Sequence, residues 1–68
     1  MSSNEIEPVR CQVLGETEKA YHLEDANDTS RQAWFPKSQV SFRRRNTRTG
    51  EATAEIPLWL LESKGWNS

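Results

Sequence analysis

The alternation of apolar and polar residues predicts β-strands along most of the chain. From Val9 to Val13 every second residue is valine or cysteine, which is the period of a strand with one buried face. The turn-forming segment Gly15–Glu18 follows, and Tyr21 and Leu23 then alternate with histidine and glutamate. These two segments predict a first β-hairpin.

A third strand follows a polar loop. The segment Asp25–Ser30 contains residues whose side chains hydrogen-bond their own backbone, so we expect it to form a loop. Arg31–Phe35 then predicts a strand, which ends at Pro36 because proline has no amide hydrogen to donate to a sheet. The chain before the first strand is polar. We therefore expect residues 1–7 to form a disordered N-terminal tail and residues 8–66 to form a single β-rich domain.

The last two predicted strands, residues 40–45 and 51–56, flank a five-residue loop, 46–50. Gly50 suits the left-handed backbone position that such loops need. The register can be predicted, because a slip of one residue would move every apolar side chain to the wrong face. The expected pairs are Val40 with Ile56, Phe42 with Ala54, and Arg44 with Ala52.

A short helix is predicted near the C-terminal end. Pro57 fits the first position of a helix, residues 58–64 are good helix formers, and Gly65 fits the position after its end. About two turns of helix are not stable alone, so we expect Leu58 and Leu61 to dock on the sheet.

Together these elements predict a mainly β fold, either a small antiparallel sheet or an SH3-like barrel of about five short strands, with one short C-terminal helix. The side chains expected inside are Cys11, Val13, Tyr21, Leu23, Phe42 and Ile56. The side chains expected at the surface are Arg10, Gln12 and Glu24. Cys11 is expected to act as a small buried hydrophobe.

The composition narrows the classes of function. With 68 residues the chain can form one domain, in which a large enclosed active site is not expected. The formal net charge is −1, so any electrostatic attraction must be local. The single cysteine excludes an intrachain disulfide and a cysteine-rich zinc site, and it favours the reducing cytoplasm. No apolar run reaches the ~20 residues that span a bilayer, so no membrane partner is expected.

No motif for catalysis or for a cofactor is recognisable. His22 is the only histidine, so a cluster of histidine ligands for a metal cannot form. The chain has no glycine-rich phosphate loop, and neither Cys11 nor any serine lies in a recognisable nucleophile context. We therefore expect no enzyme activity, no cofactor and no metal site.

Two segments carry a resemblance to a known family. They are Trp34-Phe35-Pro36-Lys37-Ser38-Gln39-Val40 and Ile56-Pro57-Leu58-Trp59-Leu60, the second followed by Lys64-Gly65. They resemble a family of small, uncharacterised bacteriophage and prophage proteins with a W-x-P-K-S-Q-(V/I) segment and a C-terminal W-L-x-x-K-G helix, and the likeness covers residues 19–66. The resemblance implies a phage-type origin, a compact fold and a gene that lies near the genes of phage DNA metabolism. It implies no catalytic residue. The chain departs from the family between Phe42 and Gly50, which is unusually basic, so a function of these arginines is not implied by the resemblance.

The strongest functional signal is a basic segment, because six basic residues and no acidic residue lie between Thr29 and Gly50. Guanidinium groups bind phosphate through paired hydrogen bonds, which makes this segment a candidate for polyanion binding. The candidate residues are Arg43, Arg44, Arg45, Arg48 and Lys37. The alternative is a charge-paired surface, in which Arg43 and Arg45 face Glu51 and Glu55. Arg44 and Arg48 have no expected acidic partner and favour binding most.

The tryptophans complete the list of candidates. We expect Trp34 and Trp59 to be core anchors because of the apolar area that each can bury, although the alternation does not decide which face Trp34 occupies. Trp66 lies beyond Gly65 and is expected to be exposed. The candidate aromatic contacts are Trp34 and Trp66.

The expected function is that of a non-catalytic accessory binding protein of the phage or prophage type, in the cytoplasm of a bacterial host cell. In one interpretation its partner is single-stranded nucleic acid. In the other the chain is a protein-protein interaction module that binds a host or phage protein, with inhibition of that protein as one outcome. The sequence does not predict the oligomeric state.

Overall fold

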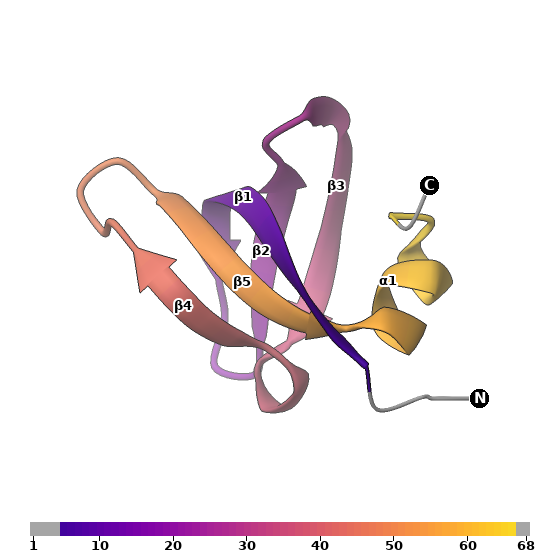
Figure 1. Ribbon diagram of the computed structural model, residues 1–68. Coiled ribbons are helices and arrows are strands. Elements are labelled where there is room, and N and C mark those ends of the chain that lie inside the picture. The colour runs from indigo at the N-terminus through magenta and orange to yellow at the C-terminus, as the bar shows by residue number, and fades with distance from the viewer. Residues whose placement is uncertain (1–4, 67–68) are drawn as a thin grey trace.

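The strands form one antiparallel sheet, followed by a short helix (Figure 1). The computed structural model describes residues 5–66. Its elements are β1 (Ile6–Glu16), β2 (Ala20–Asp25), β3 (Asp28–Pro36), the 3-10 helix η1 (Lys37–Gln39), β4 (Ser41–Arg45), β5 (Glu51–Pro57) and α1 (Leu58–Lys64). The strand order is β3-β2-β1-β5-β4. The predicted fold class is therefore confirmed: the protein is mainly β, with five antiparallel strands and one short C-terminal helix.

The sheet is strongly curved. Tyr21 of β2 and Phe42 of β4 are separated by two strands in the sheet, yet their ring centroids lie only 4.9 Å apart. Between the outer strands β3 and β4, which η1 connects, no ladder of main-chain hydrogen bonds forms within residues 5–66. Of the two expected arrangements, the structure therefore has the open sheet, and its concave face encloses the core.

The central strand β1 begins earlier than predicted. Ile6 pairs with Pro57 and Glu7 pairs with Ile56, so these two residues extend the ladder between β1 and β5. The prediction of a disordered tail over residues 1–7 is wrong for Ile6 and Glu7, because main-chain pairing needs no apolar alternation. Glu5 precedes the strand, and its carbonyl accepts a hydrogen bond from the Leu58 amide at 2.8 Å, whereas residues 1–4 of the expected tail lie outside the described residues.

The β2–β3 connection is tighter than the predicted loop. Strand β3 already begins at Asp28, because Asp25 accepts a hydrogen bond from the backbone amide of Asn27 at 2.9 Å and closes the turn. In the β4–β5 loop the Asn46 side chain accepts a bond from the Arg48 amide at 2.9 Å. Gly50 has a φ of 85°, as the sequence predicts for this loop.

The register of β4 against β5 contains a bulge. Phe42 pairs with Ala54 as predicted, but the register then shifts between Phe42 and Arg44. Arg44 consequently lies opposite Thr53, and Arg45 takes the position opposite Ala52. The predicted pairing of Arg44 with Ala52 is wrong, because Arg43 adds one residue to β4. The bulge moves Arg44 to the convex face of the sheet and Arg45 to the face that carries Phe42.

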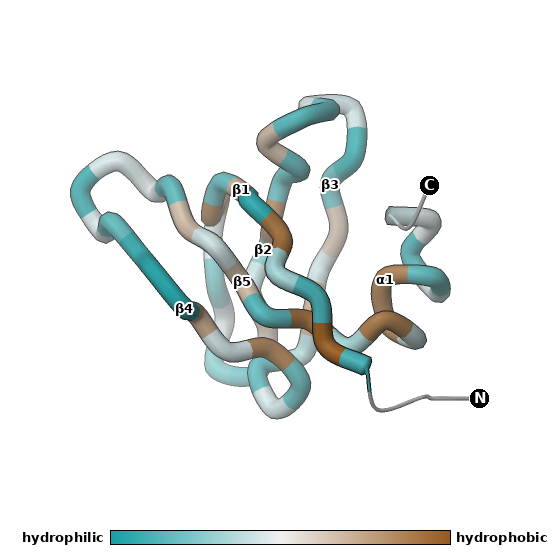
Figure 2. The backbone as a smooth tube through the Cα atoms, in the orientation of Figure 1, coloured by the Kyte–Doolittle hydropathy of each residue, from teal (hydrophilic) through white to brown (hydrophobic). Residues whose placement is uncertain are grey.

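The concave face and the helix supply the core. Its buried apolar members are Cys11, Leu23, Phe35, Val40, Ala52, Ala54, Ile56, Leu60, Leu61 and Trp66. Three of the side chains expected inside, Val13, Tyr21 and Phe42, are only partly buried and pack against this cluster. Among those expected at the surface, Arg10 is exposed and Gln12 and Glu24 are half-buried. Figure 2 shows the same division along the backbone, with apolar residues in α1 and strongly hydrophilic ones along β4.

The helix forms over residues 58–64 as predicted, but Pro57 ends β5 and caps the helix instead of occupying its first position, and the contacts of the helix differ from those expected. Leu60 and Leu61 are the buried residues of α1, whereas Leu58 is half-buried and Trp59 is 45% exposed. The expectation that Trp59 anchors the core is therefore wrong. The expectation that Trp66 is exposed is also wrong, because only 8% of it is accessible. Its amide donates to the carbonyl of Leu61 at 2.8 Å, and this bond turns the chain back toward the sheet.

Candidate functional site

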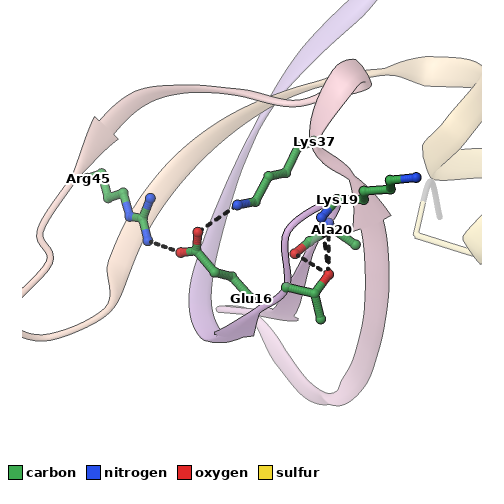
Figure 3. A network of polar contacts seen from close by, with 6 residues as sticks. Glu16, Lys19, Ala20, Lys37 and Arg45 are labelled. Atoms are coloured by element: carbon green, nitrogen blue, oxygen red, sulfur yellow. Dashed lines mark hydrogen bonds and ion pairs between the residues drawn. The ribbon is translucent and has the colours of Figure 1, made fainter.

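The candidate basic residues divide into two groups, and the first surrounds an acid. Glu16, at the end of β1, accepts a 2.7 Å hydrogen bond from Lys37 and a 3.1 Å bond from Arg45 (Figure 3). Lys37 belongs to η1 and Arg45 ends β4, so the carboxylate bridges three separate elements. The hydrogen bonds from Lys37 and then Arg45 hold the pKa of Glu16 below its usual value. The carboxylate of Glu16 thus compensates one of the two positive charges and hydrogen-bonds both cations.

Two aromatic rings lie beneath these cations. The Lys37 Nζ atom is 4.9 Å from the centroid of the Tyr21 ring, and the Arg45 Cζ atom is 4.9 Å from that of Phe42. Tyr21 and Phe42 meet edge to face at an interplanar angle of 74°. The rings and the carboxylate of Glu16 together fix both cations in position. We name Glu16, Tyr21, Lys37, Phe42 and Arg45 the Glu16 cluster. Sequence reasoning missed Glu16 and Tyr21 as members of the site.

The second group consists of Arg43, Arg44 and Arg48, and all three residues are exposed. Within the described part of the chain the ion pairs involve Arg31, Lys37 and Arg45, and none involves this second group. The predicted alternative, in which Arg43 and Arg45 pair with Glu51 and Glu55, is therefore wrong. Its physical cause is the bulge at Arg43, which turns Arg45 away from β5 acids and toward Glu16.

The candidate aromatic contacts do not join the basic residues. Trp34 is 46% exposed and stacks on His22, with ring centroids 4.7 Å apart and an interplanar angle of 11°. The expectation that it anchors the core is wrong. It lies in β3, whereas the arginines lie in β4 and its loop, at the opposite edge of the sheet. Trp66 is buried against Phe35 and offers no exposed ring to a ligand.

The remaining reactive group is a thiol in the core. Cys11 is 2% exposed, and burial raises its pKa to about 11. A thiol with such a pKa is almost fully protonated near neutral pH and is a poor nucleophile. Among residues 5–66, no group of three or more histidine, cysteine, aspartate or glutamate side chains could hold a metal ion. No helix in the described part of the chain is long and apolar enough to cross a membrane.

The arrangement offers a hairpin with a hydrogen-bonded loop and accessible guanidinium groups, beside a second cationic cluster that an acid holds in place. Comparison with known proteins adds no relative to this description. No family model matches the chain, and no curated protein or solved structure gives a significant match. What the site can do chemically therefore follows from its own side chains. It can bind an anion that presents several charged oxygen atoms along an extended surface.

Proposed function

We propose that this protein is a non-catalytic binding protein that contacts single-stranded nucleic acid through the β4–β5 hairpin. The observation that supports the proposal most is the state of Arg43, Arg44 and Arg48. They are exposed, and among residues 5–66 no ion pair occupies them. An arginine without an internal partner loses no existing interaction when it binds a phosphate, whereas a paired arginine must first break its ion pair.

The hairpin geometry supports the same function. Asn46 fixes the loop by accepting a hydrogen bond from the Arg48 amide, and the amide of Asn46 donates to the carbonyl of Glu51 at 2.8 Å. An ordered loop loses little conformational freedom when it binds, which leaves more of the electrostatic attraction for affinity. The bulge at Arg43 turns Arg44 to the convex face, away from the Glu16 cluster, where its guanidinium group can meet a phosphate.

The biological setting is part of the proposal and is supported by the resemblance described above. Small phage and prophage proteins with similar segments would act in the cytoplasm of a bacterial cell, where single-stranded nucleic acid arises during phage DNA metabolism. The arginine-rich hairpin is the feature in which this chain departs from those proteins. The proposed contact is therefore a property of this chain.

A second candidate function is binding to a host or phage protein and inhibiting it. It is favoured by two exposed apolar residues near the start of β1 and α1. Ile6 is 59% exposed and pairs with Pro57, and Trp59 follows two residues later with 45% exposure. Tryptophan is among the side chains that most often anchor protein interfaces. Such an interface would leave the arginine hairpin uninvolved.

The test is a titration with short single-stranded DNA and RNA at several salt concentrations. Three phosphate contacts predict a slope of log K against log salt of about −2, at ~0.7 per contact. The variant Arg44→Ala/Arg48→Ala should flatten this slope by about 1.4. The matched control Lys19→Ala/Lys64→Ala removes the same charge from exposed positions outside the hairpin and should leave the slope nearly unchanged. If amide shifts of residues 42–51 do not respond at millimolar nucleic acid, the second candidate function replaces this one.

A further inference from the structure

A second cation lies beside the hairpin on the convex face of the sheet. Thr53 of β5 pairs with Arg44 of β4 on one side and with Arg10 of β1 on the other. Directly paired residues project from the same face, and neighbouring strands are about 4.8 Å apart. The two arginines therefore flank the Thr53 hydroxyl at a Cα separation of about 10 Å. Arg44 reaches this row only because of the bulge at Arg43, since an unbroken register would place it on the opposite face.

A row of carboxylate and amide groups runs beside the cationic row. Gln12 of β1 pairs with Glu51 of β5 and with Glu24 of β2, two positions along from Arg10. The Gln12 amide donates to the Thr49 carbonyl at 2.5 Å, and Glu24 accepts a 3.1 Å bond from Gln32. These bonds hold the side chains in place. For the side chains of Arg10, Arg44 and Glu51, no hydrogen bond or ion pair is found within residues 5–66.

Both rows line one open groove of about 830 Å³. Its lining includes Arg10, Gln12, Glu24, Arg44, Glu51 and Thr53, together with Ala26 and Thr29 from the region of the β2–β3 turn. The groove thus runs between that turn and the β4–β5 hairpin, the two arms that diverge from β1 in Figure 1. Among residues 5–66 its lining is mostly polar, with Cys11, Ala26 and Ala52 as apolar members, and it includes no aromatic ring.

We propose that this groove binds one strand of nucleic acid, with a backbone phosphate held by Arg10, Thr53 and Arg44 and with base amino groups donating to Glu24 and Glu51. The inference rests on the proposed function and names its ligand more closely. Guanidinium and hydroxyl groups suit phosphate oxygens, and carboxylates accept hydrogen bonds from exocyclic amino groups such as that of cytosine. Carboxylates also repel a phosphate backbone, which keeps it on the cationic row.

The chemistry favours a single strand over a duplex. In a duplex the amino groups are engaged in base pairs, and phosphates of both strands would approach Glu24 and Glu51 as well as the arginines. In a single strand the base edges are free, so one side of the groove can contact the backbone while the other contacts the bases. Since thymine and uracil have no exocyclic amino group, the groove should distinguish cytosine from them.

The decisive experiment measures fluorescence anisotropy with labelled eight-residue oligomers of deoxycytidine, thymidine, cytidine and uridine. We expect Arg10→Ala to weaken binding and to flatten the salt slope by about 0.7, whereas Lys19→Ala should leave the slope unchanged. The affinity of the wild type for the cytosine oligomer should exceed that for the thymine or uracil oligomer by about fivefold or more, which is the lower end of the discrimination that one direct base contact provides. The DNA and RNA pairs show separately whether the sugar matters.

The base contacts are tested by Glu51→Gln. The change removes a repelling charge and should raise the affinity for every oligomer, but the ratio of cytosine to thymine or uracil affinity should fall toward one. The matched control Glu18→Gln removes an exposed carboxylate in the β1–β2 turn and should leave that ratio unchanged. Amide spectra of each variant establish that the fold is intact.

The outcomes separate this inference from the proposed function. If Arg10→Ala is as silent as Lys19→Ala while Arg44→Ala/Arg48→Ala weakens binding, the hairpin binds nucleic acid but the groove does not, and the inference is overturned. An equally tight complex with a duplex of the same length also overturns it. If the wild type binds none of the oligomers, both proposals fail together.

Discussion

The indole ring of Trp66 packs edge to face against the ring of Phe35, with centroids 5.0 Å apart and an interplanar angle of 77°. Phe35 is completely buried in β3, at one edge of the sheet, and Trp66 follows α1 at the end of the described chain. The turn that leads from α1 to Trp66 uses Gly65, whose φ of 75° is readily adopted by glycine. The contact therefore ties the C-terminal segment to β3 and covers the core there.

The substitution Trp66→Ala should cost about 3 to 5 kcal/mol, as is usual when a buried tryptophan is truncated. A domain of this size has only about 5 to 15 kcal/mol of stability in total, so the variant should be largely unfolded in mild urea. Urea unfolding followed by circular dichroism measures the loss. Trp59→Ala is the control on the exposed side of α1 and should cost much less. Equal midpoints for the two variants would show that Trp66 does not anchor the core.

Much of the fold could be predicted because the strands each bury one face. Cys11, Leu23 and Ile56 lie where the alternation places them, and all three are buried. The position of Trp66 could not be predicted in this way. A local pattern indicates that the helix ends at Gly65, but the direction of the following residue depends on Phe35, which is distant in the sequence. An apolar residue that follows the end of a helix can therefore be buried in the core although no neighbouring residue in the sequence predicts it.

The candidate site was predictable in composition but not in geometry. The basic segment marks the correct hairpin, yet the bulge at Arg43 has no glycine or other local marker, and it decides which arginine faces which side. The role of Glu16 in holding two cations could not be predicted either, because its hydrogen-bond partners lie 21 and 29 residues away in the sequence. Only the curvature of the sheet brings these residues together. Arg10 could not be predicted as a site residue either, because only the pairing of both β1 and β4 with β5 places it across Thr53 from Arg44.

The buried thiol predicts a loss of stability at alkaline pH. Burial raises the pKa of Cys11 from 9.0 to about 11, so the folded state holds the proton more tightly than the unfolded state. Its contribution is fully present below pH 9.0 and is lost as the pH rises through about 11. The difference corresponds to at most about 3 kcal/mol of unfolding free energy. Urea unfolding near pH 8 and pH 10.5 measures the loss, which should be about 2 kcal/mol larger for the wild type than for Cys11→Ala. Parallel losses in the two proteins would contradict it.

The loop that carries Arg48 depends on a glycine. A Cβ atom at Gly50 would collide with the Gln12 amide and lie 3.2 Å from the Val13 carbonyl, and the φ of 85° is strained for any other residue. Gly50→Ala should therefore cost at least about 1 to 2 kcal/mol. Gly15→Ala is the matched control, because its Cβ would meet nothing closer than the His22 Cβ at 4.0 Å. Thermal unfolding of both variants decides the matter, and a loss in Gly15→Ala as large as that in Gly50→Ala would refute the argument.

The Glu16 cluster predicts a loss of stability in acid. Hydrogen bonds from Lys37 and Arg45 lower the pKa of Glu16, so its contribution is present above the ordinary value of 4.5 and is lost as the pH falls through the lowered one. Glu16→Gln cannot lose a charge in this range. The wild type should therefore lose more stability than Glu16→Gln between pH 5 and pH 3, as urea unfolding would show. Glu18→Gln should follow the wild type, and a Glu18 variant that behaves like the Glu16 variant would remove the cluster as the cause.

At neutral pH, Glu16→Gln should strengthen binding to nucleic acid. The carboxylate of Glu16 occupies the hydrogen-bond donors of Lys37 and Arg45, and a phosphate that approaches them must compete with it. A neutral amide competes less well, and the rings of Tyr21 and Phe42 keep both cations near the hairpin. If both cations gain a phosphate contact, the salt slope should become steeper by up to about 1.4. Glu18→Gln changes the net charge by the same amount, so any effect of overall charge appears in both variants and cancels in their comparison. Identical slopes for Glu16→Gln and Glu18→Gln would place Lys37 and Arg45 outside the interface and confine it to Arg10, Arg43, Arg44 and Arg48.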